Sequence, residues 1–203
     1  MKALLLSVRP EHAINILKGE KTLELRKSVP KGYKGWVYVY VTKGKLYLWS
    51  YGRIKENSNW EWETIYQLTQ PYHARFSDAL NGTIPFRFWF DEYISYKYYA
   101  DDNTYFVKRL QDLGYGAEGV LKRLCLTRDE FKEYGQGKDL YAWHIKNLGI
   151  FPKPMQLGEF YKTNLWATEE MIENIRPSWR KPYCVKKAPQ SYMYVYVREE
   201  IGK

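Results

Sequence analysis

The sequence predicts an α+β fold, a mixture of sheet and helix in a single domain spanning residues 1–203. Two kinds of pattern predict it. Several segments alternate between two kinds of side chain with the period of two that is typical of strands. Between them lie short segments with helical spacing and capping residues. Aromatic residues make up 18% of the chain, and this content favours a folded, strand-rich protein over a disordered one.

The N-terminal segment predicts a strand, a helix and a second strand in turn. Residues 3–8 form a short apolar run that Arg9 and Pro10 end, which is typical of a buried strand. Pro10 suits the first position of a helix, and Gly19 can adopt the left-handed conformation that ends one. From Thr22 the period changes from that of a helix to that of a strand.

The later elements follow from the same two periods. Strands are expected at residues 36–42, 46–51, 83–90, 141–145 and 192–197, and helices at 102–108, 117–125, 127–134 and 168–174. Thr127 and Glu130 have the spacing of a capping box, and Pro85 favours an edge strand or a bulge. Residues 52–82 are interpreted as an aromatic-rich insertion in which residues 60–63 alternate like an edge strand.

Positive charge is concentrated at the two ends of the chain. The net charge is +9, with +7 in residues 1–45, −3 in residues 46–175 and +5 in residues 176–203. If the ends meet in the fold, they form one basic surface, which favours polyanions and above all nucleic acid. A solvated basic surface without a partner is the alternative.

Several classes of protein are disfavoured by what the sequence lacks. The two cysteines, Cys125 and Cys184, have no second cysteine nearby, and the three histidines show no metal-ligand spacing. No phosphate-binding loop or nucleophile-elbow motif is present, so no cofactor and no metal are expected. No apolar run approaches the length of a membrane helix, and none resembles a signal peptide. A reduced, cytoplasmic protein is expected.

Lys21, Glu24 and Arg26 are the strongest candidates for a functional site. Because Leu23 and Leu25 must point into the core, alternation turns Glu24 and Arg26 to the opposite face of the strand. Arg26 can clamp a phosphate or a base edge, Glu24 can accept an exocyclic amine or act as a general base, and Lys21 can bind phosphate or act as a nucleophile. The alternative is a strand salt bridge worth at most about 1 kcal/mol.

The other ligand-binding candidates are polar residues at the ends of expected elements: Ser7, Thr22, His144, Gln190 and Ser191. Glu24 and Arg26 are expected to face a concave pocket, with Lys21 at its rim and His144 or Gln190 across it. His144 can instead be a hydrogen-bonded structural residue between aromatic neighbours. Gln190 and Ser191 can either bind a base edge or cap the entry to the last strand.

The motif Gly19-x-Lys21-x-x-Glu24-x-Arg26 resembles the ASCH domain of the PUA-like superfamily. Further blocks resemble phage and prophage members of that family, namely residues 125–127, 137–145, 153–154 with 159–160, and 189–191 with 194–195. The resemblance implies a small, mixed, PUA-like β-barrel surrounded by helices. In such a barrel residues 3–8 and 192–197 would be neighbouring strands, and the motif would line a cleft.

The resemblance implies a module that binds RNA or a modified nucleotide through this cleft. Some small ASCH proteins are amidohydrolases that remove the acetyl group from acetylated cytidine. Lys21 matches their motif, whereas a catalytic threonine stands where this chain has Glu24. A small hydrolase acting on a modified nucleoside or on RNA, with Lys21 and Glu24 as its catalytic residues, is therefore the alternative, and whether the protein is an enzyme stays open. A host protein as partner is a third hypothesis.

Overall fold

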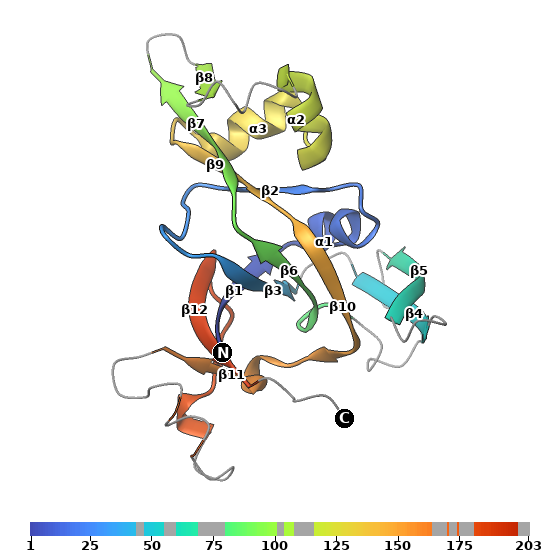
Figure 1. Ribbon diagram of the computed structural model, residues 1–203. Coiled ribbons are helices and arrows are strands. Elements are labelled where there is room, and N and C mark those ends of the chain that lie inside the picture. Colours follow the sequence, from blue (N-terminus) through green and yellow to red (C-terminus); the bar gives the residue numbers. More distant parts are fainter. Residues whose placement is uncertain are drawn as a thin grey trace. The chain divides into compact units, whose positions relative to one another are not determined.

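The structure is a computed structural model of the chain and describes residues 1–43, 47–54, 60–68, 80–100, 104–107, 116–163, 170, 174 and 181–198. Within these residues it is a mixed α+β protein with more strand than helix, as the sequence predicts (Figure 1). The chain divides into two compact units. The first unit comprises Met1–Glu11, Trp36–Phe88 and Leu148–Lys203, and the second comprises His12–Gly35 and Trp89–Asn147.

The first unit is built on a six-stranded sheet in the order β10-β6-β3-β1-β12-β11. Its strands are β1 (Lys2–Val8), β3 (Gly35–Val41), β6 (Ile84–Phe90), β10 (Lys146–Met155), β11 (Phe160–Lys162) and β12 (Tyr192–Val197). Strand β1 pairs with β12 in antiparallel fashion and with β3 in parallel fashion. The expected pairing of the first and last strands is therefore confirmed. Closure into a small barrel stays a prediction.

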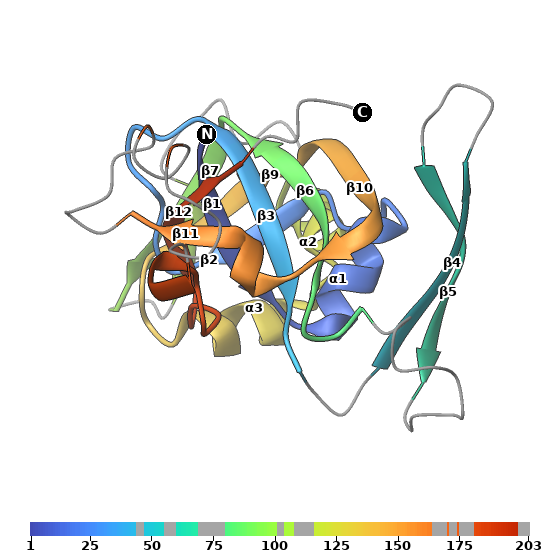
Figure 2. The same ribbon diagram turned by 90° about the horizontal axis from the view of Figure 1, so that it is seen from below.

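Strand β6 is an inner strand of this sheet, between β3 and β10 (Figure 2). Of the two alternatives expected from Pro85, the edge strand is therefore wrong, and the bulge stays a prediction. Pro85 is the second residue of β6, near the strand start, where a missing N–H disturbs the pairing least. Three phenylalanines of the strand, Phe86, Phe88 and Phe90, are at most 2% exposed, and their burial favours the inner position.

A separate hairpin of β4 (Tyr47–Ile54) and β5 (Trp60–Leu68) falls in the first unit. The two strands pair in antiparallel fashion, with a register shift between Tyr51 and Gly52. The strand expected at residues 60–63 is confirmed as the start of β5. That residues 52–82 are an insertion stays a prediction, and residues 55–59 and 69–79 lie outside the described part.

The second unit is built on a four-stranded sheet in the order β2-β9-β7-β8. Its strands are β2 (Leu23–Arg26), β7 (Tyr93–Tyr99), β8 (Thr104–Val107) and β9 (Leu140–His144), and the helices are α1 (Pro10–Leu17), α2 (Gly116–Leu124) and α3 (Arg128–Gly135). Leu23 and Leu25 of β2 form a buried core with Val120 and Leu124 of α2 and Phe131 of α3. Helices α2 and α3 thus cover one face of this sheet (Figure 1).

The helix expected at residues 102–108 is wrong for the part that the structure describes. Residues 104–107 form β8, which pairs with Tyr96–Tyr99 of β7. The sequence Thr-Tyr-Phe-Val consists of β-branched and aromatic residues, which favour strands, and an available strand edge decides the outcome. The helix expected at residues 168–174 lies almost entirely outside the described residues.

The described residues also include two short 3₁₀-helices, Leu157–Glu159 and Lys181–Tyr183. No helix in the described part of the chain has both the length and the apolar character needed to cross a bilayer.

The capping box of α3 is present as the sequence predicts. The Thr127 hydroxyl accepts a hydrogen bond from Glu130 N at 3.2 Å, and Glu130 Oε2 accepts one from Thr127 N at 2.7 Å. Replacing Thr127 by alanine is expected to lower the free energy of unfolding by about 1 kcal/mol at neutral pH. Urea unfolding of both proteins measures the difference.

This difference should depend on pH. Hydrogen bonds from the Thr127 backbone N–H and then from its hydroxyl lower the pKa of Glu130. A lowered pKa in the folded state gives stability that is present above the ordinary pKa and is lost as the pH falls through the folded pKa. Alanine keeps the backbone N–H and loses only the hydroxyl that donates to Glu130 Oε2 at 2.9 Å. The part of the cost of Thr127→Ala that comes from this hydroxyl should therefore be lost below about pH 4. An equal cost at neutral and acidic pH would contradict the role given to the Glu130 carboxylate.

Candidate functional site

The turn after α1 determines which residues of strand β2 point into the core. Gly19 has φ +75°, the left-handed conformation expected at the helix end. The backbone N–H groups of Glu20 and Lys21 both donate to Asn15 O at 2.9 Å, which brings the chain back toward the helix. Leu23 and Leu25 then enter the core against α2, so the pleat turns Glu24 and Arg26 to the other face of the sheet.

Lys21, Glu24 and Arg26, here called the charged cluster, are brought together and buried. Their exposed fractions are 2%, 4% and 9%. Arg26 Nη2 lies 2.8 Å from Glu24 Oε1, and Lys21 Nζ lies 3.6 Å from Glu24 Oε2. Among the described residues nothing donates a hydrogen bond to Oε2. The sequence places Lys21 at the rim of a pocket, whereas in the structure its side chain is buried beside Glu24.

Lys21 and Thr22 hold the end of helix α2. Lys21 Nζ donates to Leu124 O at 2.6 Å, the carbonyl of the last α2 residue, where the helix dipole favours a positive charge. Thr22 N donates to Arg123 O, and Arg123 Nε donates to the Thr22 hydroxyl at 2.9 Å. Lys21 is therefore shared between a helix end and a carboxylate, and the Thr22 hydroxyl has a structural partner.

Cys125 follows the end of α2. Burial raises the pKa of its thiol, and the nearby Lys21 charge offsets this only in part. Because only the thiolate is nucleophilic, a raised pKa disfavours reaction of this thiol at neutral pH. In the part of the chain that the structure describes, no three His, Cys, Asp or Glu residues are grouped as metal ligands.

The strand register shows which residues of β9 and β7 share the sheet face of Glu24 and Arg26. Glu24 lies opposite Trp143 of β9, and Arg26 lies opposite Tyr141. Strand β9 pairs in turn with β7, so Tyr141 lies opposite Ser95. Residues directly opposite in an antiparallel pair project on the same side. One face of the sheet therefore carries the charged pair and a row of aromatic and polar side chains.

His144 is on the other side of this sheet. It lies opposite Leu23 in the register, and Leu23 belongs to the core against α2. Its backbone N–H donates to Glu92 O at 3.0 Å. The register therefore does not bring His144 to the face that carries Glu24 and Arg26.

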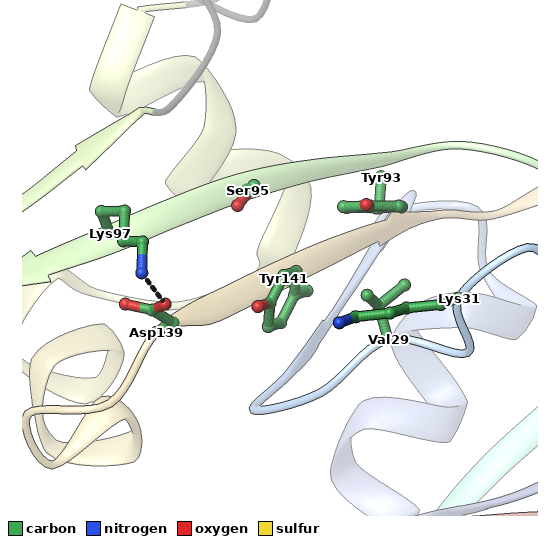
Figure 3. A pocket seen from close by; sticks show the side chains of 7 residues that line it. All are labelled: Val29, Lys31, Tyr93, Ser95, Lys97, Asp139 and Tyr141. Carbon is green, nitrogen blue, oxygen red and sulfur yellow. Dashed lines mark hydrogen bonds and ion pairs between the residues drawn. The ribbon is translucent and has the colours of Figure 1, made fainter.

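A groove of about 220 Å³ lies on the Arg26 face of the sheet (Figure 3). It is lined by Val29, Lys31, Tyr93, Ser95, Lys97, Asp139 and Tyr141. Lys97 Nζ and Asp139 Oδ2 form an ion pair at 2.6 Å. None of these residues was predicted from the sequence as a site residue. The alternation of Tyr93, Ser95 and Lys97 with the buried Ile94 and Tyr96 is the signal that could have indicated this face.

The remaining candidates, Ser7, Gln190 and Ser191, belong to the first unit. The Ser7 hydroxyl donates to Pro189 O at 2.7 Å, and Ser7 N donates to Ser191 O at 2.9 Å. Gln190 is exposed. The structure thus joins Ser7 to the segment before β12, a structural use of Ser7 and of the Ser191 backbone.

Comparison with known proteins gives a likeness at the level of structure. No family model and no curated protein matches the sequence. A solved structure of ASCH from Zymomonas mobilis is 14% identical with a TM-score of 0.48, over 98% of this chain and 89% of that chain. Two single-substitution variants of that protein give 14% and 13% identity with TM-scores of 0.48 and 0.46, over 98% of this chain and 93% and 89% of theirs. At these values the likeness assigns no residue a role.

Proposed function

We propose that the protein is an RNA- or modified-nucleotide-binding module of the ASCH type, with the charged cluster on β2 as its ligand site. The +9 net charge suits a polyanionic partner. The motif of Lys21, Glu24 and Arg26 resembles that of ASCH domains. Charged donors, a carboxylate acceptor and aromatic rings on one sheet face are the components with which proteins bind unstacked bases and phosphates.

The observation that carries this proposal is the placement of Glu24 and Arg26. They lie on the face of the sheet opposite the one that α2 and α3 cover, beside Trp143 and Tyr141 of the neighbouring strand β9. Oε1 of Glu24 is held by Arg26, while Oε2 has the Lys21 ammonium 3.6 Å away and accepts no hydrogen bond from the described residues. A buried acceptor of this kind is costly unless it gains a donor, and the exocyclic amine of a base is a suitable one.

The hydrolase alternative gains less support from the same geometry. An acyl transfer needs a nucleophile with a base beside it. Lys21 Nζ lies against Leu124 O and Glu24 Oε2, and the Thr22 hydroxyl accepts from Arg123. The Glu24 carboxylate is paired with Arg26 at 2.8 Å. These partners favour binding over covalent chemistry, and turnover of acetylated cytidine would favour the hydrolase.

Binding to single-stranded RNA should weaken steeply with salt. Each phosphate contact releases condensed counterions, so the logarithm of the affinity falls linearly with the logarithm of the salt concentration. A slope of about −2 to −3.5 is expected, for roughly three to five contacts at about 0.7 each. Fluorescence anisotropy with a short labelled RNA, repeated over a salt series, measures this slope.

Two results would contradict the proposal. An affinity that is flat between low and physiological salt would mean that phosphates are not bound. An absence of RNA and nucleotide binding at low salt would rule out the proposed function. The next hypothesis would then be a protein partner, which a pull-down after nuclease treatment would test.

A further inference from the structure

We infer that the groove on the Arg26 face seats one base of a single-stranded RNA against Tyr93 and Tyr141, with Lys31 at the adjoining phosphate. This inference rests on the proposed function and extends it to a second place on the sheet. The charged cluster is almost wholly buried, whereas the groove is open and its lining includes exposed side chains. The groove therefore offers the contact surface that the cluster alone does not.

The rings of Tyr93 and Tyr141 form a fixed aromatic wall. Their centroids are 5.7 Å apart with an interplanar angle of 68°. Tyr93 is also stacked on Phe90 at 6.5 Å, and Phe90 packs against the fully buried Trp143 at 4.9 Å. Rings held in this way lose little freedom when a base stacks on them, and stacking on aromatic side chains is the usual way in which proteins bind unpaired bases.

Asp139 supplies a fixed acceptor at the other end of the groove. Its Oδ2 pairs with Lys97 Nζ, and its Oδ1 accepts from Tyr98 N at 3.3 Å. The hydrogen bond and the charge of Asp139 raise the pKa of Lys97. Ser95 projects between Lys97 and the rings (Figure 3). A base that lies on Tyr93 and Tyr141 would therefore meet a hydroxyl and a carboxylate along its edge.

Charge and size favour RNA as the occupant. The lining holds two lysines and one aspartate, so it is positive by one charge, and Arg26 lies in the same cross-strand row as Tyr141. Lys31 is exposed in the segment after β2, where its ammonium can reach a phosphate. A volume of about 220 Å³ is below the roughly 300–1,000 Å³ of pockets that enclose drug-sized molecules. A single base on an open groove fits this volume.

Surface variants with matched controls test the inference. Tyr141→Leu and Lys31→Gln are each expected to weaken binding of a short labelled single-stranded RNA by about fivefold or more. Lys31→Gln should also reduce the salt slope by about 0.7, the share of one phosphate. Tyr99→Leu changes an exposed tyrosine of the same strand β7 outside the groove lining, and Lys34→Gln changes an exposed lysine three residues after Lys31. Both controls should bind within about twofold of the unmodified protein.

The outcomes separate this inference from the proposed function. If the unmodified protein binds RNA and the two groove variants bind as well as their controls, the groove assignment is wrong and the proposed function stands. If the unmodified protein binds nucleotides but not RNA, the groove assignment is wrong and the proposed function stands; if it binds neither, both are wrong. Equal losses in groove variants and controls would mean that general surface charge and aromatic area, and not this groove, bind the RNA.

Discussion

Glu24→Gln is expected to destabilise the protein by about 3–5 kcal/mol, the cost of removing one partner from a buried ion pair. Glu24 is 4% exposed and is the carboxylate that Lys21 and Arg26 share. A neutral glutamine of the same shape leaves two cations close together, and of the contacts described for the Lys21 ammonium the hydrogen bond to Leu124 O remains. Like charges in a poorly solvated place repel strongly, because the local dielectric is low.

Urea unfolding followed by tryptophan fluorescence measures this loss. Glu92→Gln is the matched control, because Glu92 is also paired with a lysine, at 3.2 Å from Lys146, but its side chain is 59% exposed. Exposed pairs contribute about 0–1 kcal/mol, so the control should stay close to the unmodified protein. Equal effects of the two substitutions would contradict the burial of the cluster.

Adding Arg26→Met to Glu24→Gln should restore part of the lost stability. The double variant removes the Arg26 cation as well as the anion, and the shorter apolar side chain of methionine fills part of the space. Replacing a buried ion pair as a whole is often neutral, whereas breaking it is costly. The two substitutions should therefore be coupled by about 1–3 kcal/mol in a double-mutant cycle. Strictly additive losses would mean that Glu24 and Arg26 do not act as a pair.

The local parts of the fold follow from the sequence. Pro10 and Gly19 bound α1, and Thr127 with Glu130 caps α3, because each depends on residues a few positions apart. Alternation in β2 correctly places Leu23 and Leu25 in the core.

Two elements were predicted wrongly from the sequence. Residues 104–107 form a strand that pairs with β7, the element just before them in the chain, and their β-branched and aromatic composition already favours this outcome. Pro85 lies in an inner strand because it stands near the start of β6, and the position of β6 between β3 and β10 depends on residues far away in the chain. Propensity decides only where tertiary contacts leave a choice.

In the candidate site, too, local spacing predicts some features, and others depend on residues far away in the chain. The spacing of Lys21, Glu24 and Arg26 identifies the cluster, but not its burial, since that depends on Leu124 and Trp143 more than a hundred residues later. The groove combines three separate parts of the chain, residues 29–31, 93–97 and 139–141. Only the strand register brings them together.

RNA binding should depend on the Glu24–Arg26 pair more than on net charge. The double variant Glu24→Gln/Arg26→Met removes one charge of each sign, so the net charge stays at +9. Hydrogen bonds to charged groups contribute about 1.5–3 kcal/mol each. Loss of the guanidinium and of the carboxylate should therefore weaken RNA binding by more than about tenfold. The partly restored stability of the double variant should keep it folded, so that this loss can be measured.

The matched control is Glu92→Gln/Lys146→Gln, which also leaves the net charge unchanged and removes the more exposed ion pairs of Lys146 with Glu92 and Asp91 in the same unit. The decisive measurement is the affinity of these two variants for the same labelled single-stranded RNA at low salt, by fluorescence anisotropy, after circular dichroism has verified that both are folded. We predict a more than about tenfold loss for Glu24→Gln/Arg26→Met and an unchanged affinity for the control. An unchanged affinity in both variants would contradict the assignment of the charged cluster as the ligand site and would leave Glu24 and Arg26 as a structural salt bridge.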